Sequence, residues 1–108
     1  MGKEDVLAIL ESDISNPGSY KSGEYLEEHA LRHAFNIVAT DRPGLVEALT
    51  EWINLKTEPR TMLAVRIAQQ LKLAELINPI RKLRNEIAHG QVFPSYYLRY
   101  IDEALEDI

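Results

Sequence analysis

The sequence contains no cysteine, which excludes several kinds of structure and site. Without thiols the chain has no disulfide framework, no thiolate metal site and no cysteine nucleophile. Disulfide-free chains are typical of a reducing compartment, so we expect a cytoplasmic location. The sequence also lacks an apolar run of about 18 residues, as a membrane span requires, and an apolar segment of signal-peptide type near its start. We therefore predict no association with a membrane.

What is present is the composition of an ordinary globular protein. Hydrophobic residues make up 45% of the 108 residues and charged residues 27%, so disorder is not expected. The length suits one core, and we predict a single domain over residues 1–108. Alternating apolar and polar residues, the pattern of a strand, do not occur in any run. The chain is therefore predicted to be all-α.

Turn-forming residues divide the chain into about six helices. The residues from 14 to 23 form a loop rich in Gly, Pro, Ser and Asn. Caps are predicted at Asp41, Thr57 and Ser95, and Gly90 suits the left-handed position that ends a helix. The expected helices cover residues 4–13, 24–39, 43–55, 60–71, 74–90 and 95–108. Because the linkers are short, sequential neighbours should form antiparallel hairpins.

The stretch from Thr57 to Gly90 carries the clearest helical periodicity. Apolar residues recur there at steps of three and four, which places them on one face of each of two helices. The residues are Leu63, Ile67 and Leu71 in the first helix and Leu76, Ile80, Leu83 and Ile87 in the second. We predict that the two faces pack against each other as a helical hairpin.

Residues 24–55 repeat the pattern of residues 60–90 at an offset of 30 or 31 positions. The paired helices are RTMLAVRIAQQL (60–71) and ELINPIRKL (75–83), and YLRYIDEAL (97–105) has the form of a further first helix. This arrangement resembles the HEAT repeat family and its bacterial HEAT-like relatives. The resemblance implies a stack of helical hairpins, an α-solenoid, that binds or scaffolds another protein without catalysis.

Charges of opposite sign are segregated along the chain. The balance is −6 over residues 1–55, +5 over residues 56–84 and −4 over residues 85–108, within a total of −5. One interpretation is that the basic residues pair with acidic neighbouring helices. The other is a surface for an acidic partner or a phosphate backbone. Its candidate binding residues are Arg60, Arg66, Lys72, Arg81 and Lys82.

A second resemblance lies in LRNEIAHG (83–90), which is similar to the motif of the HEPN family, small helical bundles of which many are RNases. It implies that Arg84 would hold the scissile phosphate, His89 would act as general acid or base, and Asn85 would orient them. No metal or other cofactor is implied. Five positions along a helix is about 140° around its axis, so Arg84 and His89 do not share a face. The alternative is that Arg84 is a solvated residue and His89 a favourable helix-end charge.

His29 and His33 are four residues apart beside acidic residues, but two histidines without a placed third ligand do not define a metal site. We therefore predict no metal and no cofactor. The favoured interpretation is a non-catalytic protein-binding or scaffold module, with self-association as an open alternative for covering the ends of a short stack. A metal-independent RNase acting on RNA is the competing interpretation.

Overall fold

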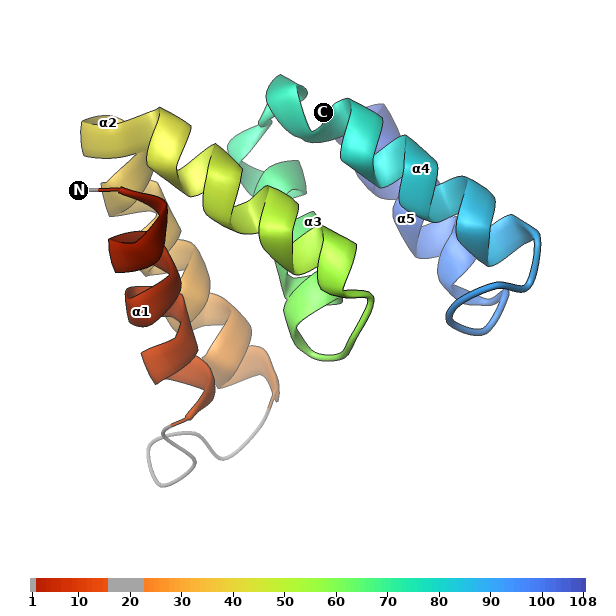
Figure 1. The fold of residues 1–108 in the computed structure, drawn as a ribbon, viewed down its shortest axis with the longest axis horizontal. Helices are drawn as coiled ribbons and strands as arrows, with labels where there is room; N and C mark the ends of the chain where they lie inside the picture. The colour runs from red at the N-terminus through yellow and green to blue at the C-terminus, as the bar shows by residue number, and fades with distance from the viewer. Residues whose placement is uncertain (1, 16–22) are drawn as a thin grey trace. The chain divides into compact units, whose positions relative to one another are not determined.

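The computed structural model describes residues 2–15 and 23–108, and within these ranges all regular structure is helical. Five α-helices and a short 3₁₀ helix, η1 (Ala74–Leu76), are found in the described residues (Figure 1). The α-helices are α1 (Lys3–Ile14), α2 (Gly23–Leu55), α3 (Arg60–Leu71), α4 (Ile77–Ala88) and α5 (Tyr97–Asp107). The all-α prediction is confirmed. Most of the loop predicted for residues 14–23 lies outside the described residues.

The chain divides into two compact units, residues 1–48 and residues 49–108, and each is described by itself. Unit 1 contains α1 and most of α2, whereas unit 2 contains the last part of α2 and every later helix. The single domain over residues 1–108 stays a prediction. In the part of the chain that the structure describes, no helix has the length and apolar character needed to cross a membrane.

In unit 1, α1 and the first part of α2 bury small and branched apolar side chains. Val6 and Leu10 of α1 and Ala30 and Ala34 of α2 are all 0% exposed. Alanine at two positions four apart keeps one face of α2 narrow, so another helix can approach it closely. The first turn of α1 is closed by Asp5, whose carboxylate accepts a hydrogen bond of 3.2 Å from the Gly2 amide.

The predicted break between residues 39 and 43 lies inside α2. Asp41 has non-helical angles, φ −150° and ψ 69°, so α2 is kinked there and consists of two helical segments. Its carboxylate accepts a hydrogen bond of 3.1 Å from the Gly44 amide, which confirms the predicted cap. A Cβ atom at Gly44 would lie 2.2 Å from Asp41 Oδ2. Any residue larger than glycine at position 44 would therefore collide with the capping carboxylate of Asp41.

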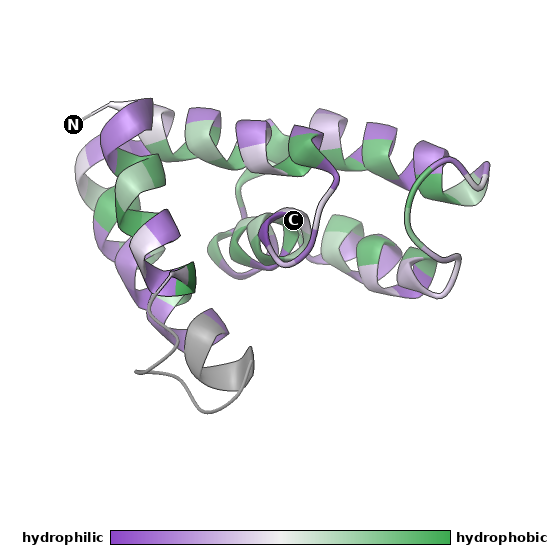
Figure 2. Ribbon diagram, turned by 60° about the horizontal axis from the view of Figure 1, so that its bottom comes forward, coloured by the Kyte–Doolittle hydropathy of each residue, from purple (hydrophilic) through white to green (hydrophobic). Residues whose placement is uncertain are grey.

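In unit 2, α5 packs against both α3 and α4 (Figure 1). The prediction that the two apolar stripes of residues 57–90 pack against each other as a hairpin is not confirmed, because α3 and α4 each pack against α5. The helices carry their hydrophobic residues mainly on one side (Figure 2). The fully buried large side chains of this unit include Trp52, Ile53, Ile67, Leu76, Ile80, Leu83, Ile87 and Ile101. Gly90 ends the turn after α4 with φ 71°, as predicted.

A buried hydroxyl group holds the turn between α2 and α3. Thr61 is 0% exposed, and its Oγ1 donates to the Trp52 carbonyl at 2.7 Å and accepts from the Thr57 amide at 3.0 Å. The prediction that Thr57 caps the next helix is wrong, because Pro59 occupies the N-cap and no side chain caps it. The Ser95 cap is also wrong, since Tyr96 is the N-cap of α5 and makes no side-chain cap bond.

We expect Thr61→Val to lower the free energy of unfolding by about 1–3 kcal/mol. Valine has nearly the same shape, so no cavity forms, but the Trp52 carbonyl and the Thr57 amide both lose their partner. The measurement is urea unfolding followed by the fluorescence of Trp52, the one tryptophan of the chain. The control is Thr40→Val, because the Thr40 hydroxyl only bonds the Ile37 carbonyl of its own helix. Equal effects of the two changes would contradict this account of the turn.

Candidate functional site

One side of α4 is exposed along its whole length. Its buried stripe, Ile80, Leu83 and Ile87, is at most 1% exposed. The opposite side, which we name the outer face of α4, consists of Asn78, Arg81, Lys82, Asn85, Ala88 and His89, all of them exposed. With 3.6 residues per turn these six positions lie within about 120° of arc. The sequence folds this way because the apolar residues recur every three or four positions and leave the remaining arc polar.

The outer face of α4 carries positive charge and no acidic residue. Arg81 and Lys82 form no ion pair or hydrogen bond with any residue that the structure describes. The acidic residue of this helix, Glu86, lies one turn after Lys82 and bonds the Lys56 ammonium group. Arg81 and Lys82 are therefore available to a partner, because the nearby carboxylate is paired with another cation.

Arg84 lies at the edge of the outer face and is held by α5. Its Nε donates to Asp102 Oδ1 at 2.5 Å. This hydrogen bond, with the attraction of the same carboxylate, raises the pKa of Arg84 above its ordinary value. The side chain is 40% exposed, so the ion pair is reached by solvent. Because only Nε is engaged, the terminal guanidinium nitrogens remain available as donors.

His89 bonds its own helix rather than Arg84. Its Nδ1 lies 2.6 Å from the Asn85 carbonyl oxygen, which also accepts the His89 backbone amide at 3.0 Å. A carbonyl oxygen only accepts, so the proton of the neutral ring resides on Nδ1 and Nε2 keeps its lone pair. Arg84 and His89 thus have different partners, while Asn85 and His89 share the outer face.

The other three predicted binding residues have partners within the chain. Arg66 Nη1 donates to Gln69 Oε1 at 3.2 Å, and Lys72 Nζ donates to the Asp107 carbonyl at 2.8 Å. Arg60 also takes part in an interaction. Of the five predicted residues, the structure leaves Arg81 and Lys82 together, exposed and adjacent on the outer face of α4.

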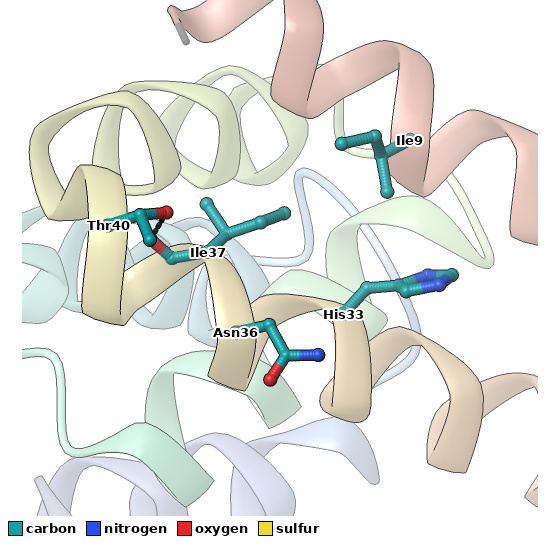
Figure 3. Close-up of a pocket in the computed structure, with 5 residues that line it drawn as sticks. All are labelled: Ile9, His33, Asn36, Ile37 and Thr40. Carbon is teal, nitrogen blue, oxygen red and sulfur yellow. Dashed lines mark hydrogen bonds between the residues drawn. The ribbon is translucent and has the colours of Figure 1, made fainter.

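Unit 1 contains a hollow of about 290 Å³ between α1 and α2, lined by Ile9, His33, Asn36, Ile37 and Thr40 (Figure 3). His33 Nδ1 lies 2.8 Å from Oδ2 of Asp13, a carboxylate that is 3% exposed. Sequence reasoning placed His33 with His29 and did not consider Asp13. The signal was present, because Val6, Leu10 and Asp13 fall on one helical face and an acid there is buried. No cluster of three or more metal-binding side chains occurs in residues 2–15 and 23–108.

We expect the neutral His89 ring to be protonated on Nδ1. The reason is the hydrogen bond to the Asn85 carbonyl, which fixes the tautomer. Two-bond ¹H–¹⁵N correlation spectra above pH 8 distinguish the two ring nitrogens directly. A proton found on Nε2 would show that the ring does not bond the end of α4 in solution.

Comparison of the chain with protein-family models, with curated proteins and with solved structures finds no match. The resemblances to HEAT-like repeats and to the HEPN motif therefore stay predictions from the residues that carry them.

Proposed function

We propose that the chain is a non-catalytic protein-binding module whose outer face of α4 receives an acidic segment of another protein. The observation that carries this proposal is the pair Arg81 and Lys82, which is exposed and has no partner among the described residues. The chain as a whole has a charge of −5, so a cationic face without acids is a local exception. Such a face favours approach of an acidic partner in one orientation.

The residues around this face suit reversible recognition. Asn78 and Asn85 add amide groups, which both donate and accept, beside the two cations. Since exposed ion pairs are individually weak, specificity would come from several contacts arranged along a helix whose buried stripe fixes its position.

In this proposal the helices act as a scaffold that presents α4, as the HEAT-like resemblance implies. Two ion pairs support the presentation from either side: Lys56 with Glu86, and Arg84 with Asp102. Both neutralise charges at the edges of the outer face and leave its centre cationic. The helical-hairpin stack itself is part of the proposal.

We expect the double change Arg81→Glu and Lys82→Glu to weaken binding of a fluorescent Glu/Asp-rich peptide about tenfold at low ionic strength. The reason is that two favourable charge contacts become unfavourable. Fluorescence anisotropy measures the dissociation constant. Raising the salt concentration should weaken peptide binding by the parent protein more than peptide binding by the double variant.

The matched control is Arg99→Glu, which reverses an exposed cation of α5 that pairs with Glu103 at 3.3 Å. It changes the net charge in the same direction but lies outside the outer face. If Arg99→Glu weakens peptide binding as much per reversed charge as the double change does, binding depends on the total charge of the protein. The outer face of α4 is then not the binding surface.

A metal-independent RNase of HEPN type is a second candidate, and the orientation of His89 favours it. With the proton held on Nδ1, the exposed Nε2 can accept the proton of a ribose 2′-hydroxyl group. The unengaged guanidinium nitrogens of Arg84 would hold the phosphate, and Asn85 would orient the pair. Against this candidate, the ion pair with Asp102 partly neutralises the positive charge that Arg84 would offer to the phosphate.

Incubation of the protein with end-labelled single-stranded RNA in EDTA decides between the two candidates. The binding-module proposal predicts no cleavage beyond that of a protein-free sample. Under the RNase candidate, both Arg84→Ala and His89→Ala would lower the cleavage rate by a factor of about 10²–10⁴, as expected for loss of a general base or of phosphate stabilisation. Cleavage that either change leaves intact comes from a contaminant.

A further inference from the structure

Unit 2 also contains a hollow, and three of its seven lining residues are aromatic. Its volume is about 480 Å³, and it lies between the turn after α2 and the loop that joins α4 to α5. The lining residues are Lys56, Thr57, Glu58, Phe93, Pro94, Tyr96 and Tyr97. None of them belongs to the outer face of α4, so this aromatic pocket is a separate surface.

The three rings of the aromatic pocket are in contact with one another. Phe93 and Tyr97 have centroids 5.5 Å apart with an interplanar angle of 61°, and Tyr96 and Tyr97 have centroids 4.7 Å apart. Tyr96 is nevertheless 72% exposed, the most exposed of the large hydrophobic side chains in the described residues. An aromatic side chain that is ordered by a neighbour and open to solvent is typical of a recognition surface.

The lining of the aromatic pocket has one cation and one anion, and the unpaired charge is the negative one. Lys56 is occupied by Glu86, whereas Glu58 is exposed and forms no ion pair or hydrogen bond with the described residues. The faces of aromatic rings also carry negative potential. A phosphate or carboxylate would therefore be disfavoured, and a cation would be attracted by both the rings and the carboxylate.

The backbone at the aromatic pocket has an unusual conformation. Lys56 and Phe93 both have positive φ values, 58° and 52°, although neither is glycine. A bulky residue in the left-handed region is uncommon and costs conformational energy. Lys56 directly follows the last residue of α2, where a left-handed residue commonly ends a helix, as Lys72 does after α3. Lys56 and Phe93 line the same hollow from different loops, so these two backbone turns shape the aromatic pocket.

We propose that the aromatic pocket receives an arginine side chain of a partner protein. The planar guanidinium group stacks on the exposed ring of Tyr96 and donates two hydrogen bonds to the Glu58 carboxylate. Arginine is favoured over lysine because only the guanidinium group combines a flat face for stacking with a bidentate fork. This site goes beyond the proposed function, since it selects the opposite charge from the outer face of α4.

The test uses N-acetylarginine amide as the probe and N-acetylcitrulline amide as its neutral, nearly isosteric control. Each is titrated into the full-length protein while the aromatic side-chain resonances are followed by NMR. We expect saturable shifts of the Tyr96 and Tyr97 ring signals with the arginine compound only. Equal shifts with both compounds, or no shift with either, would overturn the proposal.

Two variants locate the binding. Tyr96→Ala and Glu58→Gln should each weaken binding of the arginine compound about 2- to 5-fold. This factor is expected for loss of a cation–π contact or of an exposed ion pair. Glu106→Gln is the matched control, because Glu106 is an exposed acid of α5 outside the aromatic pocket. If Glu106→Gln weakens binding as much as Glu58→Gln, the probe senses only net charge and the site is refuted. The double change Arg81→Glu and Lys82→Glu should leave binding of the arginine compound unchanged. Failure of the aromatic-pocket proposal can therefore be distinguished from failure of the proposed function.

Discussion

The turn that joins α2 to α3 depends on the hydroxyl group of Thr61. It connects the Trp52 carbonyl at the end of one helix to the Thr57 amide at the approach to the next, inside the core of unit 2. Thr61 thereby closes the segment that begins at Trp52 and ends at Thr61 itself, which includes Lys56 and Glu58. Lys56 reaches Glu86 on α4, and Glu58 contributes the free carboxylate of the aromatic pocket. The aromatic pocket, and the ion pair beside the outer face of α4, therefore depend on how this one buried polar group is satisfied.

The distribution of charge partners decides which cations of the basic block remain available. The acidic helix α5 engages Arg84 through Asp102 and Lys72 through the Asp107 carbonyl. Arg81 and Lys82 project from the side of α4 that is opposite its buried stripe, so α5 does not reach them. Pairing with acidic neighbours and presentation of a cationic surface thus both occur, on different sides of one helix.

The helices could be predicted from the sequence because each one buries a stripe at helical spacing. The break at Asp41 was also predictable, since a capping carboxylate followed by Pro43 and Gly44 has a local cause. Thr57 and Ser95 show the limit of the same rule. α3 begins three residues beyond Thr57 and α5 begins two residues beyond Ser95, so neither residue occupies the N-cap position.

Much of the candidate site was beyond sequence reasoning for a related reason. Arg81, Lys82, Asn85 and His89 could be placed on one exposed face from spacing alone. The engagement of Arg84 depends on Asp102, which is 18 residues away, and the aromatic pocket combines two loops that are distant in sequence. Contacts of this kind follow from how α5 packs, and no local pattern encodes them.

The left-handed turn at Gly90 has a consequence for how a partner could engage this unit. It ends α4 immediately after His89, and Phe93 follows only four positions later, so the cationic face and the aromatic pocket adjoin along the chain. A single extended segment that carried acidic residues and an arginine at matching separation would make its second contact as an intramolecular event, at high effective concentration. One surface prefers acidic residues and the other prefers arginine. Together they would select segments in which the two kinds of charge occur in the right order, and would bind uniformly acidic or uniformly basic segments less tightly.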